Sequence, residues 1–247
     1  MYRNIISEEV SHRGHNGEDI LAYYARPAGN GPFPGVVILH HMPGWDEWCC
    51  EVARKFAHHG YAAVLPYLFH RFGPPEQMDD TIAKVRAGGG VPDAMTIGDA
   101  VGAAQFLQAQ PNSTGKLGLI GFCSGGRQVV LVASNSKEFS AAVDCWGGRV
   151  VAPADTLTPA QPKAPIDMTA DLHPPLLGIF GNDDQSPSPD QVNEHEAALK
   201  QAGKTYEFHR YDGAGHGFFA TDRPNYRAVQ APDAWGKVWS WYDKYLK

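Results

Sequence analysis

An apolar run leads into a glycine-rich turn in the segment Lys116-Leu-Gly-Leu-Ile-Gly-Phe-Cys-Ser-Gly-Gly-Arg127. The run is typical of a buried strand, and the residues after the turn can continue as a helix. Gly121 and Gly125 flank Cys123, and glycine tolerates the strained backbone that a tight strand-to-helix turn imposes. The pattern therefore predicts a nucleophile elbow with Cys123 at its apex. The N-terminus of the following helix would favour its thiolate form.

The same pattern also occurs in ordinary turns that hold a buried, unreactive cysteine. Ser124 is a rival nucleophile, but one residue beyond the apex its side chain would turn away from a base. Its backbone N–H would instead help to bind an oxyanion. Partners elsewhere in the chain must therefore distinguish a catalytic Cys123 from a structural one.

The composition indicates a compact globular chain. Of its 247 residues 43% are hydrophobic and 19% charged, which is enough apolar material for a core, and we expect one domain over residues 1–247. A formal net charge of -6 and the lack of a Lys and Arg cluster argue against nucleic acid as a partner. Residues 1–10 include the acidic Glu8 and Glu9, where a signal peptide needs a long apolar region, and no apolar run approaches the roughly 18 residues of a spanning helix. We therefore expect no membrane association and a cytoplasmic location.

The cysteine and histidine spacings indicate neither a disulfide scaffold nor a metal site. Cys49, Cys50, Cys123 and Cys145 match no zinc pattern, so free thiols are expected, with the adjacent pair as packing residues. The eleven histidines include no H-E-x-x-H motif. We expect no metal and no cofactor, and the oligomeric state has no signal in the sequence.

Strand-like and helix-like segments alternate along the chain. Strands are expected at residues 5–10, 20–26, 36–39, 61–65, 116–120, 141–146, 176–180 and 205–211, and helices at about 47–58, 91–109, 189–201 and a last one ending near 245. This alternation predicts an α/β fold with a mostly parallel, doubly wound sheet and helices on both faces. Residues 67–90 and 147–175 fit no element. Both leave the carboxyl end of a strand, where sites of such sheets lie, so they are candidate pocket rims or plain surface excursions.

A cysteine nucleophile needs a base and an acid that orients the base, and candidates for both follow later strands. His216 lies in the glycine-flanked loop Gly213-Ala-Gly-His-Gly-Phe218, and Asp183 and Asp184 follow the strand at 176–180. We choose Asp184, which the preceding turn brings round, and keep Asp183 as the alternative. The order nucleophile, acid, histidine is the one expected of α/β-hydrolases.

With these motifs the chain resembles the dienelactone hydrolase (carboxymethylenebutenolidase) family of α/β-hydrolases. The resemblance runs from about Ile5 to the C-terminus and rests on the motifs at residues 60–66, 121–126, 181–184 and 213–218 and on the stretch 226–235. It implies an α/β-hydrolase fold and a triad of Cys123, His216 and Asp184. The implied activity is cofactor-independent hydrolysis of a small-molecule ester or lactone through an acyl-enzyme. A thioesterase or acyl transferase with this triad, and a catalytically silent small-ligand-binding protein, are the alternatives.

The segment after the strand at 36–39 departs from the family. Family members that open dienelactones carry a glutamate near the nucleophile there, and the matching position is His41. His41 could stabilise a resting thiolate as an imidazolium, or it could merely hydrogen-bond with His40 in the pocket wall. Met42 is expected to donate the second oxyanion N–H beside that of Ser124, and Trp45 is a candidate for the pocket.

The arginines with which the family binds the dienelactone carboxylate have no clear match, because the residue four past His216 is Ala220. Substrate identity therefore stays open. The remaining pocket candidates are the arginines and aromatic residues Arg71, Arg127, Arg223, Trp146 and Phe218.

Overall fold

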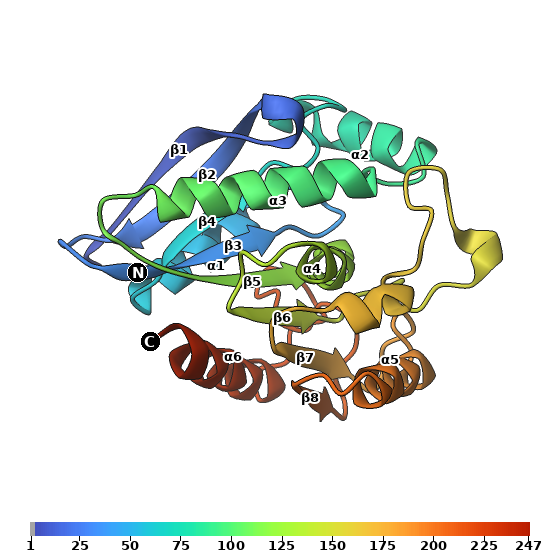
Figure 1. Ribbon diagram of the computed structural model, residues 1–247. Coiled ribbons are helices and arrows are strands. Elements are labelled where there is room, and N and C mark those ends of the chain that lie inside the picture. The colour runs from blue at the N-terminus through green and yellow to red at the C-terminus, as the bar shows by residue number, and fades with distance from the viewer. Residues whose placement is uncertain (1–2) are drawn as a thin grey trace.

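The computed structural model describes residues 3–247, and Met1 and Tyr2, part of the expected domain over 1–247, lie outside the described residues. Eight strands form one sheet with helices on both faces (Figure 1). The strands are β1 Ile5–Arg13, β2 Asp19–Pro27, β3 Phe33–Leu39, β4 Ala62–Pro66, β5 Ser113–Phe122, β6 Ala141–Cys145, β7 Leu176–Gly181 and β8 Tyr206–Tyr211. The helices are α1 Glu47–His58, α2 Met78–Ala87, α3 Asp93–Gln108, α4 Ser124–Asn135, α5 Pro189–Gln201 and α6 Gln230–Leu246. Within the described chain, none of the helices combines the length and the apolar character needed to cross a membrane.

The strand order confirms the predicted mostly parallel sheet. The strands lie in the order β1-β2-β4-β3-β5-β6-β7-β8. β2 is antiparallel to both β1 and β4, and every other neighbouring pair is parallel. The carboxyl ends of β5, β6, β7 and β8 therefore meet at one edge, where the loops that follow them can share a site.

The two faces of the sheet are both covered, which explains why the central strands are apolar without interruption. On β3, Val36 and Ile38 pack into one core with α1 and α6. Val37 and Leu39 point to the opposite face and pack into a second core with α3 and α4, the two helices drawn across one side of the sheet in Figure 1.

The two segments without a predicted element contain short helices. Residues 67–90 include the 3₁₀ turn Pro75–Gln77 and α2, and residues 147–175 include the 3₁₀ turns Ala154–Thr156 and Pro165–Asp171. Only Thr81 and Val85 of α2 are buried, so this helix has no apolar stripe that sequence periodicity could reveal.

Candidate active site

Cys123 occupies the turn between β5 and α4 in a backbone conformation that is rare outside glycine. Its φ of 57° and ψ of -117° lie outside the helical and strand regions. The turn is fixed on both sides, because Cys123 N–H donates to Cys145 O (3.1 Å) and Gly126 N–H donates to Cys123 O (2.9 Å). A Cβ on Gly125 would overlap the carbonyl group of Leu39, so only glycine lets α4 begin this close to β3.

His216 and Asp184 meet at the edge where β7 and β8 end. The His216 Nδ1–H donates to Asp184 Oδ2 at 2.8 Å, and Asp184 Oδ1 accepts from the Ser186 N–H at 2.8 Å. The Asp184 residue is 3% exposed, whereas Asp183 is exposed to solvent. Asn225 Nδ2–H donates to the His216 carbonyl and helps to hold its loop. Of the two aspartates, Asp184 is therefore the one that binds His216.

The thiol and the imidazole stabilise each other's charged form. Burial alone would raise the pKa of Cys123, but the hydrogen bond and charge of His216 and the N–H groups of Ser124 and Met42 lower it below its usual value. Burial alone would likewise lower the pKa of His216. Hydrogen bonds with Asp184 and Cys123 and the charges of both raise it to about 10. The environment therefore favours a thiolate–imidazolium pair.

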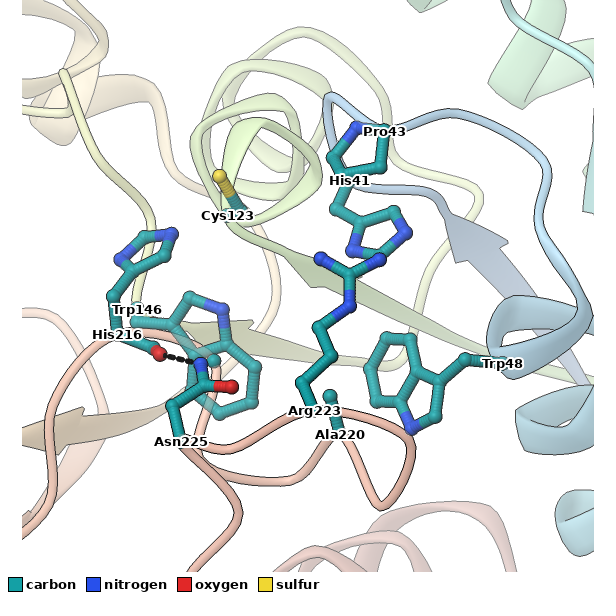
Figure 2. Close-up of a pocket in the computed structure, with 10 residues that line it drawn as sticks. His41, Pro43, Trp48, Cys123, Trp146, His216, Ala220, Arg223 and Asn225 are labelled. Carbon is teal, nitrogen blue, oxygen red and sulfur yellow. Dashed lines mark hydrogen bonds between the residues drawn. The ribbon is translucent and has the colours of Figure 1, made fainter. Parts of the chain in front are cut away.

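A pocket of about 130 Å³ opens onto this pair (Figure 2). Figure 2 shows Cys123 with His216 on one side and His41 on the other. The side chains that line it include, besides these three, Pro43, Trp48, Trp146, Ala220, Arg223 and Asn225. Three of the expected pocket residues, His41, Trp146 and Arg223, thus lie with the thiol.

His41 is hydrogen-bonded to Asp46, the residue before α1. The His41 Nε2–H donates to Asp46 Oδ2 at 2.7 Å, and the same oxygen accepts from Arg223 at 2.9 Å. Asp46 Oδ1 caps α1 by accepting the Cys49 N–H at 3.0 Å. Burial alone would raise the pKa of Asp46, but the hydrogen bond and charge of His41 and the bond from Cys49 lower it to about 2. Asp46 therefore supplies a partly buried negative charge beside the pocket.

His40 has a structural role. Its Nδ1–H donates to His41 O at 2.8 Å, and its Nε2 accepts from the Leu68 N–H at 3.2 Å. The ring is 1% exposed, and burial lowers its pKa to about 4. His40 is therefore a neutral link between β3 and the segment after β4.

The other expected pocket residues lie elsewhere. Arg71 binds Asp99 and Glu18, with its closest contacts at 2.7 and 2.6 Å. Trp45 packs against Tyr67, with 5.7 Å between the centroids of the two rings. Phe218 is fully buried and packs against Trp146. Arg127 pairs with Asp93 at 2.8 Å and lines a separate cavity of about 270 Å³.

His41, Asp46 and Cys49 form the group of potential metal ligands within the described chain, with their donor atoms within 4.8 Å of one another. The chemistry of these donors does not fit a metal. Burial raises the pKa of Cys49 well above its ordinary value, which opposes the thiolate a metal requires. The carboxylate already accepts hydrogen bonds from His41 and Arg223. Within this group Asp46 is hydrogen-bonded to His41 and to the Cys49 N–H.

A sheet of this order, with an elbow cysteine after β5, a carboxylate after β7 and a histidine after β8, defines the α/β-hydrolase class. Residues 20–246 match the family model described as the Dienelactone hydrolase family. The chain belongs to this family, and it is a hydrolase of the carboxylic ester or lactone type.

The chain matches other proteins over most of its own length and most of theirs. A Methylorubrum extorquens protein named "Putative carboxymethylenebutenolidase" is 36% identical over 234 residues, covering 92% of this chain and 77% of the relative. A Salmonella typhimurium protein of the same name is 34% identical over 243 residues, covering 97% and 88%. The crystal structure of a "Putative Dienelactone Hydrolase" from Klebsiella pneumoniae superposes with a TM-score of 0.89 at 32% identity, covering 98% of this chain and 99% of that one.

Proposed function

We propose that the protein hydrolyses small carboxylic esters or lactones with Cys123 as nucleophile, His216 as proton carrier and Asp184 as the residue that orients His216. The observation that carries this proposal is the hydrogen-bonded series from Asp184 through His216 to the thiol. It has the form of a nucleophile, a base and an orienting acid.

In the acylation step the Cys123 thiolate attacks the carbonyl carbon and forms a carbon–sulfur bond. The negative charge that develops on the carbonyl oxygen is stabilised by the N–H groups of Met42 and Ser124, which already face the sulfur. His216 Nε2–H then protonates the departing alkoxide, because Nδ1 is held by Asp184. The products are a thioester and a free hydroxyl group, which stays on the same molecule when the substrate is a lactone.

In the deacylation step water replaces the alcohol. His216, now neutral, takes a proton from water as the oxygen attacks the thioester carbonyl carbon. Collapse of the intermediate releases the carboxylic acid and returns the thiolate to Cys123. The same two backbone N–H groups stabilise this second oxyanion.

Substitution of the nucleophile tests the mechanism with p-nitrophenyl acetate as substrate. Cys123→Ala should lose turnover by several orders of magnitude while its circular dichroism spectrum stays that of the parent. The parent should release a burst of nitrophenol equal to the enzyme concentration if deacylation is slower than acylation. Full activity in Cys123→Ala would disprove the mechanism.

A pair of matched amide substitutions tests the acid. Asp184→Asn should lower kcat about 10³- to 10⁴-fold, because the amide no longer favours the tautomer and charge that His216 needs. Asp183→Asn is the control, since that side chain is exposed. The assignment of Asp184 is wrong if only Asp183→Asn loses activity.

Alkylation and acceptor competition separate the alternatives. Iodoacetamide should modify Cys123 much faster than Cys49 or Cys145, whose pKa values burial raises well above the ordinary range. A silent binding protein would show no such contrast. Added alcohols or thiols that divert most of the acyl group from water would instead identify an acyl transferase.

A further inference from the structure

A hollow of about 310 Å³ lies on the face of the sheet that α1 and α6 cover. Its lining side chains include Phe219, Tyr226, Trp235 and Trp239 together with Lys55 and His59, and we call it the aromatic cleft. Within residues 3–247, the aromatic cleft shares no lining residue with the catalytic pocket of Figure 2. It is therefore separate from the site of the proposed reaction.

A stack of aromatic rings forms part of the lining of the aromatic cleft. Trp235 and Trp239 lie one turn apart on α6, with 5.0 Å between their ring centroids and an interplanar angle of 16°. Phe219 extends the stack on one side, 4.7 Å from Trp235, and His59 extends it on the other, 4.0 Å from Trp239. Such rings favour a flat, aromatic ligand, because stacked and edge-on ring pairs gain energy beyond the burial of their area.

The protein core fixes the inner side of this stack. Phe56 packs edge-on against Trp235 and Trp239, with 6.0 and 5.0 Å between the centroids. On the outer side, Trp239 and Tyr226 are only half-buried. The rings therefore keep their arrangement without a ligand, which lowers the entropic cost of binding one.

Aromatic clefts can also bind organic cations over the faces of their rings. In the aromatic cleft this position is already occupied, because Lys55 Nζ lies 4.8 Å from the centroid of the Trp235 ring. Among the described residues, no Asp or Glu lines the cleft to attract a second cation. The charges at the aromatic cleft therefore favour an anion.

Lys55 keeps hydrogen-bond donors for such an anion. Its ion-pair partner Glu51 lies one turn earlier on α1 at 3.7 Å, which is longer than a hydrogen bond. Within the part of the chain that the structure describes, Lys55 Nζ makes no hydrogen bond. The same holds for the hydroxyl groups of Thr221 and Tyr226, two residues that also line the cleft. The aromatic cleft thus offers an ammonium group and two hydroxyl groups.

The pKa of His59 reflects the positive potential at this end of α1. Burial lowers this pKa, and the charges of His58, Lys55 and Lys247 lower it further. Asp243, which pairs with Lys247 at 2.8 Å, acts in the opposite direction. His59 is therefore mostly neutral at pH 7, and its ring extends the stack without repelling or attracting an anion strongly.

The loop that carries His216 runs between the catalytic pocket and the aromatic cleft. Gly217 and Ala220 line the catalytic pocket, whereas Phe219 and Thr221 line the aromatic cleft. The two sites are therefore neighbours, and an experiment has to distinguish a ligand in the cleft from one beside the thiol.

We propose that the aromatic cleft is a second, non-catalytic binding site for a planar aromatic carboxylate. The ring of the ligand packs against Trp235 and Trp239, and its carboxylate accepts hydrogen bonds from Lys55 Nζ and from the hydroxyl groups of the cleft. The volume of the cleft is at the lower end of the range of small-molecule sites, which suits a single or a bicyclic ring system. This inference goes beyond the proposed function, because it does not involve Cys123.

The experiment compares three ligands that differ in charge or in flatness. The ligands are 2-naphthoate, the neutral 2-naphthamide and the anionic but non-planar decalin-2-carboxylate, each titrated calorimetrically into the parent protein. We expect 2-naphthoate to bind about tenfold more tightly than either of the others, because only it combines the ring contacts with a charged hydrogen bond. The affinity for 2-naphthoate should fall as salt rises, because salt screens exposed charges.

Matched variants locate the ligand. Lys55→Gln should weaken 2-naphthoate binding about fivefold and leave 2-naphthamide binding unchanged, since it removes a charged donor and no ring. Trp239→Leu should weaken the binding of both. The controls are Lys244→Gln, which removes an ammonium 5.8 Å from the Trp241 ring, and Tyr245→Leu, which removes a partly buried ring elsewhere on α6. Both controls should keep the parental affinities, and Lys55→Gln decides the test if Trp239→Leu fails to fold.

Several outcomes would overturn the proposal. They are no binding of 2-naphthoate at millimolar concentration, equal affinity for 2-naphthoate and 2-naphthamide, and parental affinity in Lys55→Gln. Alkylation of the parent with iodoacetamide should leave the affinity unchanged, and loss of binding after alkylation would place the ligand beside Cys123 and refute a separate site. The ester assays with Cys123→Ala decide the proposed function independently, so either inference can fail without the other.

Discussion

Replacement of Asp46 by asparagine removes one negative charge from the wall of the active-site pocket and keeps the cap of α1. The amide oxygen can still cap α1, because asparagine is as good an N-cap as aspartate. The hydrogen bond to Cys49 N–H can therefore persist. What is lost is the attraction of the carboxylate for His41 and Arg223, together with the hydrogen bonds that Oδ2 accepts from them. The substitution thus tests these charged contacts separately from the helix cap.

The size of the effect follows from the pKa of Asp46, which the environment lowers from 3.8 to about 2. Each unit corresponds to about 1.4 kcal/mol, so the carboxylate contributes about 2 kcal/mol to the free energy of unfolding at neutral pH. A carboxyl group whose folded pKa is lowered stabilises the protein above its unfolded pKa. This contribution is lost as the pH falls from about 4 towards about 2.

Urea unfolding of the parent and Asp46→Asn between pH 7 and pH 3 measures this difference. We expect about 2 kcal/mol at pH 7 and a smaller difference below about pH 4. Asp46→Ala should lose about 1 kcal/mol more, because it also removes the cap. A difference that is independent of pH, or that grows as the pH falls, would show that Asp46 does not act through its charge.

Two further predictions concern the elbow. In the parent, the thiolate absorbance of Cys123 near 240 nm should titrate with a midpoint below the ordinary thiol pKa of 9.0. His216→Asn should raise this midpoint more than His41→Gln does, because His216 contacts the sulfur. Equal shifts in the two variants would contradict this. Gly125→Ala should destabilise the protein by about 1–3 kcal/mol, because the new methyl group meets the Leu39 carbonyl. Gly236→Ala in α6 has open space and should be neutral or stabilising, so similar unfolding free energies for the two variants would refute the packing argument.

The sheet could be predicted because its strands are short apolar runs between turn residues. The run at 36–39 is part of β3, and its alternate side chains enter two different cores, so every position is apolar. α2 could not be predicted in the same way. It lies on the rim with few buried residues, and its sequence therefore carries no clear period of 3.6 residues.

The candidate triad could be read from the sequence because each member stands in a glycine-rich motif directly after a strand. Asp46 could be recognised only as a cap of α1, since its partner Arg223 is 177 residues away in the chain.

The backbone of Cys123 has a consequence for engineering of the protein. A positive φ costs a side-chain-bearing residue of order 1–3 kcal/mol, and glycine would adopt it without this cost. Substitution of Cys123, the proposed nucleophile, by glycine is therefore expected to raise the free energy of unfolding at the expense of activity. A library selected for thermostability alone is expected to enrich Cys123→Gly, so such selections should assay ester cleavage in every round.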